Sequence, residues 1–109
     1  MPMMEISIVP LGTKSTSLSN FVAVAERVLL KEKGIKNQIT AMGTIVEAAS
    51  VNTLLAIAQK MHKAVVQSGA KRVLTIIKID ERLDKKSSIE GKVASVVNRI
   101  KNRAKQNVH

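Results

Sequence analysis

Residues 72–80 read RVLTIIKID, a nearly continuous run of aliphatic and β-branched residues. Such a run is typical of a strand that is buried on both faces, or on most of both. It is the clearest strand signal in the chain, and the remaining elements can be placed on either side of it.

Two amphipathic helices are predicted before this strand. Apolar residues recur at helical spacing over residues 18–29, and Gly34 follows as a stop signal. A second apolar stripe over residues 50–65 starts at Ser50, a suitable N-cap, and ends before Gly69. Both helices should pack one face against the core.

Two further segments have strand character. Residues 3–10 alternate in the manner of a strand, with Ile6 facing one side and Ser7 the other. Residues 38–48 are rich in Ile, Thr and Val and are interrupted near Gly43. This second pattern allows either two short strands or one strand with a glycine kink.

A third helix is predicted at about 87–105, because Ser87 and Glu90 have capping-box spacing and apolar residues follow at helical intervals up to Ile100. The resulting order β, α, β, β, α, β, α indicates an α+β fold, the ferredoxin-like βαββαβ sandwich with a four-stranded antiparallel sheet and an extra C-terminal helix. We expect residues 1–109 to form a single domain.

One face of this sheet is expected to lack a cover within the chain. With both helices on one side, the other side would expose a mixture that includes Ser7, Val9, Thr75 or Ile77, which is too apolar to be left wholly in water. We therefore predict a homo-oligomer, dimer or tetramer, in which sheets pack or strand edges pair.

The composition excludes several classes of protein. A chain of 109 residues suits one core, and the absence of Cys removes disulfides, thiolate metal sites and a Cys nucleophile. No segment approaches the roughly 18 apolar residues that span a bilayer, so no membrane partner and a cytoplasmic location are expected.

The charge is strongly basic. The 18 basic and 8 acidic residues give a formal net charge of +10. Residues 71–109 hold 11 of the basic and 4 of the acidic residues, hence +7 of that charge. A solvated helix face is the more common reason for such a run, and nucleic-acid or other polyanion binding through the basic C-terminal helix is the alternative. Phe21 is the only aromatic residue, so base-stacking platforms are excluded.

No catalytic constellation is recognisable. The chain has no glycine-rich phosphate loop, no nucleophile elbow and no paired metal-ligand spacing, so no catalytic residue, metal or cofactor is predicted. We interpret His62 as a packing or surface residue. The acids Asp80, Glu81 and Asp84 lie among basic residues, and neutralisation within a solvated loop is expected.

Glu47 is the one acid inside an otherwise apolar and hydroxyl-bearing strand segment. A buried carboxylate needs a partner. Glu47 therefore either faces solvent, or pairs with Lys78 or Arg82, or accepts from a cationic or amino-bearing ligand. In the last case Thr44 and Ser7 are expected nearby on the same sheet surface.

Four ordered segments resemble the small thiamine-binding, YkoF-like family. They read ISIVPLGT (6–13), MGTIVE (42–47), MHK (61–63) and IKIDERLD (77–84). The match runs in order across residues 5–97. The resemblance implies a ferredoxin-like fold, association through sheets into dimers and often tetramers, and, as in some members, binding of thiamine or its hydroxymethylpyrimidine moiety.

Non-enzymatic small-molecule binding is therefore the function that the resemblance implies. An aminopyrimidine offers an amino donor and ring nitrogens, for which the carboxylate of Glu47 and the hydroxyls of Ser7 and Thr44 are suitable partners. Thr13, in a hydroxyl-rich turn, is a candidate to close over the ligand. Met42 is expected to provide a wall in place of an aromatic ring.

Overall fold

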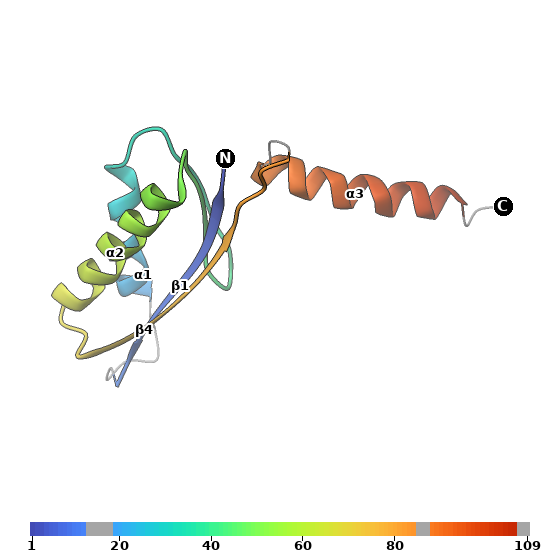
Figure 1. Ribbon diagram of the computed structural model, residues 1–109. Coiled ribbons are helices and arrows are strands. Elements are labelled where there is room, and N and C mark those ends of the chain that lie inside the picture. Colours follow the sequence, from blue (N-terminus) through green and yellow to red (C-terminus); the bar gives the residue numbers. More distant parts are fainter. Residues whose placement is uncertain (13–18, 85–87, 107–109) are drawn as a thin grey trace.

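The computed structural model describes residues 1–12, 19–84 and 88–106 (Figure 1). Its elements are, in chain order, β1 (Met3–Leu11), α1 (Ser19–Leu30), β2 (Lys36–Ile39), β3 (Thr44–Glu47), α2 (Val51–Gln67), β4 (Arg72–Asp80) and α3 (Ile89–Gln106). The strands form one antiparallel sheet in the order β2-β3-β1-β4. This is the ferredoxin-like α+β arrangement with an added helix that the sequence predicts.

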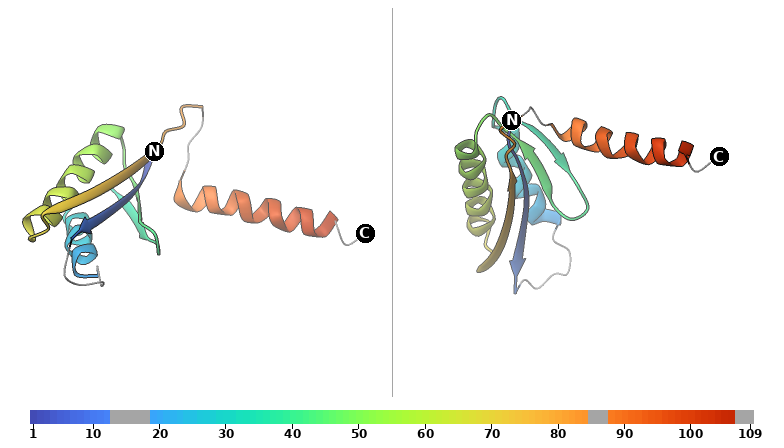
Figure 2. Two further views of the ribbon diagram at one scale, coloured as in Figure 1. Left: turned by 90° about the horizontal axis from the view of Figure 1, so that it is seen from below. Right: turned by 45° about the vertical axis from the view of Figure 1, so that its right-hand side comes forward.

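The core lies between the sheet and the helices α1 and α2, which cover the same face (Figure 2). The alternation of β1 sends its even-numbered residues into this core, and the apolar stripes of the two helices meet them there. The most completely buried side chains are Met4, Ile6, Val46, Leu54, Ile57, Met61 and Val65.

The ends of the two core helices follow their local sequence signals. The Ser50 hydroxyl accepts a hydrogen bond from the backbone N–H of Thr53 at 3.1 Å, which makes Ser50 the N-cap of α2. Gly34 after α1 and Gly69 after α2 have φ angles of 74° and 112°. This left-handed backbone lets the chain turn away from each helix at little steric cost.

The glycine-interrupted segment forms two short strands. β2 and β3 pair with each other and are joined by a turn over residues 40–43. The two alternatives left open by the sequence are thereby resolved in favour of a hairpin.

The prediction that residues 72–80 form a buried strand is correct for the strand but wrong for its burial. β4 lies at the edge of the sheet, and most of its residues are exposed. The run is aliphatic because one face of β4 packs on the core, whereas the apolar residues of the other face are exposed.

The expected assignment of β4 residues to the bare face is also corrected. Thr75 and Ile77 pair with Ile8 and Ile6, which places them on the helix-covered side. There the Nδ1 atom of His62 lies 2.6 Å from the Thr75 hydroxyl, so His62 joins α2 to β4. The neighbouring residues of β4, Leu74 and Ile76, occupy the open face instead.

Helix α3 begins at Ile89, and the Ser88 hydroxyl accepts from the backbone N–H of Gly91 at 2.9 Å. Ser87, the predicted cap, lies outside the described residues. From the end of β4, α3 projects away from α1 and α2 (Figures 1 and 2), which contributes to a longest dimension of 58 Å. None of the helices in the described ranges is long and apolar enough to cross a membrane.

Candidate functional site

A cavity forms where the two neighbours of β1 differ in length. β4 pairs with all nine residues of β1, whereas β3 pairs only with Met3–Ile6. Beyond Ile6 a cavity of about 350 Å³ lies between β1, α1 and the tip of the β2–β3 hairpin. The cavity thus occupies the place that a longer β3 would fill.

The cavity has mostly apolar walls with a few polar groups. Its apolar lining comes from Ile6, Ile8, Val9, Val22, Ala25, Ile39, Ala41, Met42 and Met61. Its polar residues are Ser7, Glu26, Thr40 and Thr44. This composition is typical of small-molecule sites, in which a few polar groups orient a ligand between apolar walls.

Glu26 and Thr44 form a hydrogen-bonded pair at this cavity. Glu26 is half-buried on α1, Thr44 is buried at the start of β3, and the Thr44 hydroxyl donates to Oε1 of Glu26. A carboxylate offers about four lone-pair sites, so one hydroxyl uses only part of its accepting capacity. The pair therefore presents an oriented acceptor to a ligand with an N–H donor or a positive charge.

Sequence reasoning missed Glu26. The sequence does contain one indication of its role. Glu26 lies four residues after Val22 and three before Leu29, at the border of the apolar stripe of α1. A side chain at that border lies beside the sheet and is not fully surrounded by solvent.

The tip of the hairpin is held by local hydrogen bonds. The Thr40 hydroxyl donates to the carbonyl of Gly43 at 2.7 Å and accepts from its N–H at 3.1 Å. A Cβ atom on Gly43 would lie 3.0 Å from the carbonyl oxygen of Ile6, closer than most side chains approach backbone. Glycine therefore allows the hairpin to sit against β1 at the mouth of the cavity, with Met42 exposed beside it.

The predicted ligand-binding residues separate into three groups. Ser7, Met42 and Thr44 all line the cavity, but Ser7 and Thr44 belong to opposite faces of the sheet, because Ser7 pairs with Ile76 and Thr44 pairs with Ile6. Thr13 lies outside the described residues. Glu47 is elsewhere, because residues three apart on a strand face opposite sides, so the expectation that Glu47 and Thr44 share a surface is wrong.

Glu47 is enclosed at the start of α3. Its exposed fraction is 3%, and its Oε2 atom lies 3.5 Å from the backbone N–H of Ile89, at the helix end that favours negative charge. The ion pairs considered for it do not form. Lys78 pairs with Glu5 at 3.6 Å, and Arg82 pairs within its own loop. Glu47 therefore connects the sheet to α3.

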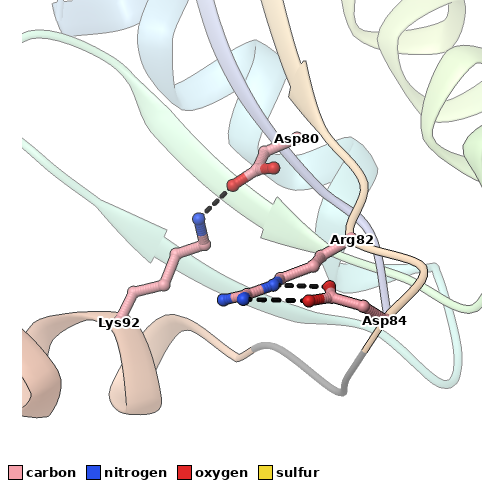
Figure 3. A network of polar contacts seen from close by, with 4 residues as sticks. All are labelled: Asp80, Arg82, Asp84 and Lys92. Carbon is pink, nitrogen blue, oxygen red and sulfur yellow. Dashed lines mark hydrogen bonds and ion pairs between the residues drawn. The ribbon is translucent and has the colours of Figure 1, made fainter.

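Two of the three acids at the end of β4 and in the loop after it, Asp80 and Asp84, pair with basic side chains, as the sequence predicts (Figure 3). Arg82 donates from Nε and Nη2 to the two carboxylate oxygens of Asp84, at 2.6 and 3.0 Å, while Lys92 of α3 pairs with Asp80. The hydrogen bonds to Asp84 raise the pKa of Arg82 above its ordinary value. Across residues 1–12, 19–84 and 88–106, no three His, Asp or Glu side chains gather closely enough to hold a metal ion.

Comparison with known proteins gives consistent matches over most of the chain. The family model described as thiamine-binding protein matches residues 4–97. A UPF0045 protein of Methanothermobacter thermautotrophicus is 42% identical over 96 residues, covering 88% of this chain and 96% of that protein. The UPF0045 protein YqgV of Bacillus subtilis is 39% identical over 99 residues, covering 88% and 94%.

Solved structures agree with the fold. The crystal structure of a hypothetical protein from Methanocaldococcus jannaschii has a TM-score of 0.78 and 36% identity, covering 87% of this chain and 94% of that one. A Thermotoga maritima structure with a TM-score of 0.73 is 21% identical and shows likeness of fold alone.

Proposed function

Because this chain belongs to the thiamine-binding protein family, we propose that it binds thiamine or its hydroxymethylpyrimidine moiety in the cavity beside β1, without chemically changing it. The observation that carries the proposal is the Glu26–Thr44 pair between apolar walls. An aminopyrimidine is a flat heterocycle with an exocyclic amino donor, and Glu26 is placed to accept from it.

The free edge of β1 supports the same ligand class. Past Ile6, β3 no longer pairs with β1, and Ser7, Ile8 and Val9 line the cavity. The edge of a strand carries backbone N–H and C=O groups that are available for hydrogen bonds. An aminopyrimidine carries a donor and an acceptor side by side, so it can hydrogen-bond to this edge in place of the missing strand.

The remaining predicted contacts fit this placement. Met42 is exposed at the hairpin tip, and its flexible thioether can fold over a pyrimidine ring where the chain has no aromatic residue to stack. Thr13 follows the cavity-lining half of β1 in sequence and stays a predicted contact. Glu47 is not included, since it faces the other side of the sheet.

The test is calorimetric titration with thiamine and, separately, with hydroxymethylpyrimidine. We expect saturable binding at one ligand per cavity, and Glu26→Gln should weaken it at least tenfold because a charged acceptor becomes neutral. The matched control is Glu32→Gln, which removes the same charge just after α1, from a pair with Lys60 at 2.7 Å outside the cavity.

The control should bind within twofold of the unchanged chain. Absence of binding by both compounds would contradict the proposed ligand class. Equal affinities of the Glu26 and Glu32 variants would instead remove Glu26 from the site while leaving the ligand class standing.

The exposure of α3 favours a second candidate function, binding of nucleic acid or another polyanion. Arg99 and Lys101 lie on an exposed helix whose sequence continues with Arg103 and Lys105. Affinity for a DNA duplex should then fall steeply with added salt, and neutralising Lys101, Arg103 and Lys105 together to Gln should flatten that dependence. A salt slope unchanged by the triple variant would exclude α3 as the binding element.

A further inference from the structure

A groove lies between α1 and α2, which pack against each other over the same face of the sheet (Figure 1). All of its lining residues come from these two helices and from the turn that follows α1, and its volume is about 440 Å³. It shares no lining residue with the cavity beside β1. A volume of this size is within the range of sites that hold small molecules.

The apolar floor of the groove comes from Val24 and Val28 of α1 and from Ala64 of α2. These three residues are half-buried. Because Val24 and Val28 lie one helical turn apart, they share one side of α1, and Ala64 lines the groove from the α2 side. The floor therefore offers contact to a compact apolar group.

Three basic side chains lie around this floor. Arg27 and Lys31 are four residues apart at the end of α1, and Lys60 comes from α2. All three residues are exposed. Two cations at this spacing repel each other on the surface of a helix. An anion placed between them would remove that repulsion.

A single acid opposes these cations at the groove. Glu32 pairs with Lys60 at 2.7 Å, whereas neither Arg27 nor Lys31 forms an ion pair with another residue of the described ranges. Three cations and one carboxylate leave a formal charge of +2 among the lining residues. The C-terminal end of α1 offsets only about half a unit of it. Most of the positive charge at the groove is therefore uncompensated.

We propose that this groove binds a small phosphate monoester, with the phosphoryl group between Arg27 and Lys31 and the organic part on the apolar floor. A phosphate monoester carries about 1.5 to 2 negative charges at pH 7, which matches the uncompensated charge of the groove. The planar guanidinium of Arg27 can donate to two phosphate oxygens at once, and Lys31 adds a second charge. This site is independent of the thiamine site proposed above.

The surroundings favour a small ester over a nucleic acid at this place. Glu32 lines the same groove as the cations, so a phosphate backbone continuing along it would meet a negative charge. The association through sheets that the sequence predicts would use the open sheet face, on the other side of the molecule from α1 and α2 (Figure 2). The groove would therefore stay accessible in such an oligomer.

The test is a nuclear magnetic resonance titration of the full chain with phenyl phosphate and with inorganic phosphate at constant ionic strength. We expect saturable shifts of the backbone amides of the groove residues, with half-saturation at about 1 mM or below. Phenyl phosphate should bind at least about threefold more tightly than inorganic phosphate, because its ring covers the apolar floor.

A double variant tests the two cations. Arg27→Gln with Lys31→Gln should raise the dissociation constant of phenyl phosphate at least about tenfold, since two charge-assisted hydrogen bonds are lost. Glutamine forms helices about as well as Arg and Lys, so melting of α1 does not explain such a loss. The matched control, Lys71→Gln with Arg72→Gln, removes one Lys and one Arg from exposed positions outside the groove and should bind within about twofold of the unchanged chain.

Three outcomes would overturn the proposal. The first is the absence of saturable shifts in the groove. The second is an equal loss in both double variants, because phosphate would then respond to the net charge of the chain. The third concerns vesicles of phosphatidylcholine and phosphatidic acid. Sedimentation with these vesicles that requires Arg27 and Lys31, without binding of phenyl phosphate, would assign the groove to a lipid headgroup instead of a soluble ester.

Discussion

Glu26 and Glu47 show how position decides what one residue type does. Glu26 lies half-buried at a cavity and shares its carboxylate with the Thr44 hydroxyl, so it keeps accepting capacity for a ligand. Glu47 is enclosed and faces the first backbone N–H of α3. The first carboxylate suits recognition and the second suits attachment of a helix, although Glu26 bonds to the first residue of β3 and Glu47 is the last residue of the same strand.

The coupling between Glu26 and Thr44 can be measured. Thr44→Val removes the hydroxyl at nearly constant volume, and we expect a loss of about 1 kcal/mol in ligand binding because Glu26 is no longer oriented. In combination with Glu26→Gln the losses should not add, since both variants disrupt the same pair. Calorimetry of the two single variants and the double variant checks this, and full additivity would mean that the residues act independently.

At the scale of elements, the helices and strands could be predicted because their signals are local. The cap at Ser50 and the apolar stripes of the helices are fixed by neighbouring residues. The exposure of β4 could not be predicted, because burial depends on which strand lies at the edge. The separation of Glu47 from Thr44 could be predicted from the sequence, since residues three apart on a strand face opposite sides.

The candidate cavity was beyond sequence reasoning for a different reason. It arises from the unequal lengths of β1 and β3 and from the approach of α1, and these are relations between elements distant in the chain. Their chemistry and the family resemblance predict Ser7, Met42 and Thr44 as ligand contacts, and these three residues line one cavity. Glu26 needed the structure, because its position at the border of the apolar stripe does not show that α1 meets the start of β3 there.

The attachment of α3 yields a prediction at this scale. Glu47→Ala removes the carboxylate that faces Ile89, so the amides of residues 89–92 should exchange with solvent about tenfold faster, as expected for the loss of about 1–2 kcal/mol of local interaction. Hydrogen exchange followed by mass spectrometry measures this. Glu81→Ala, an exposed acid in the adjoining loop, is the control. Unchanged exchange at 89–92 would show that Glu47 does not hold the helix.

At the scale of the whole molecule, net charge and ligand charge oppose each other. A chain of +10 repels a thiazolium cation at long range, while Glu26 attracts donors locally. Hydroxymethylpyrimidine has no such permanent charge and does not experience this repulsion. For thiamine, the electrostatic field of the whole chain is therefore unfavourable, whereas the carboxylate at the cavity is favourable.

Salt separates these two contributions. Because added salt screens the surface field, thiamine affinity should rise by up to a few fold between about 20 and about 200 mM salt, while hydroxymethylpyrimidine affinity should stay constant. Titrations of both compounds across this series provide the measurement. A thiamine affinity that falls with salt would mean that local attraction by the carboxylate outweighs the field of the whole chain.

The short β3 strand has a consequence for how this fold can diversify. The second half of β1, residues 7–11, has no partner on the hairpin side, and the space beside it is the cavity. Two residues inserted in each arm of the hairpin would lengthen it by about 7 Å and close much of that space. The volume of the pocket thus depends on the length of a peripheral hairpin, so it can change while the core stays the same.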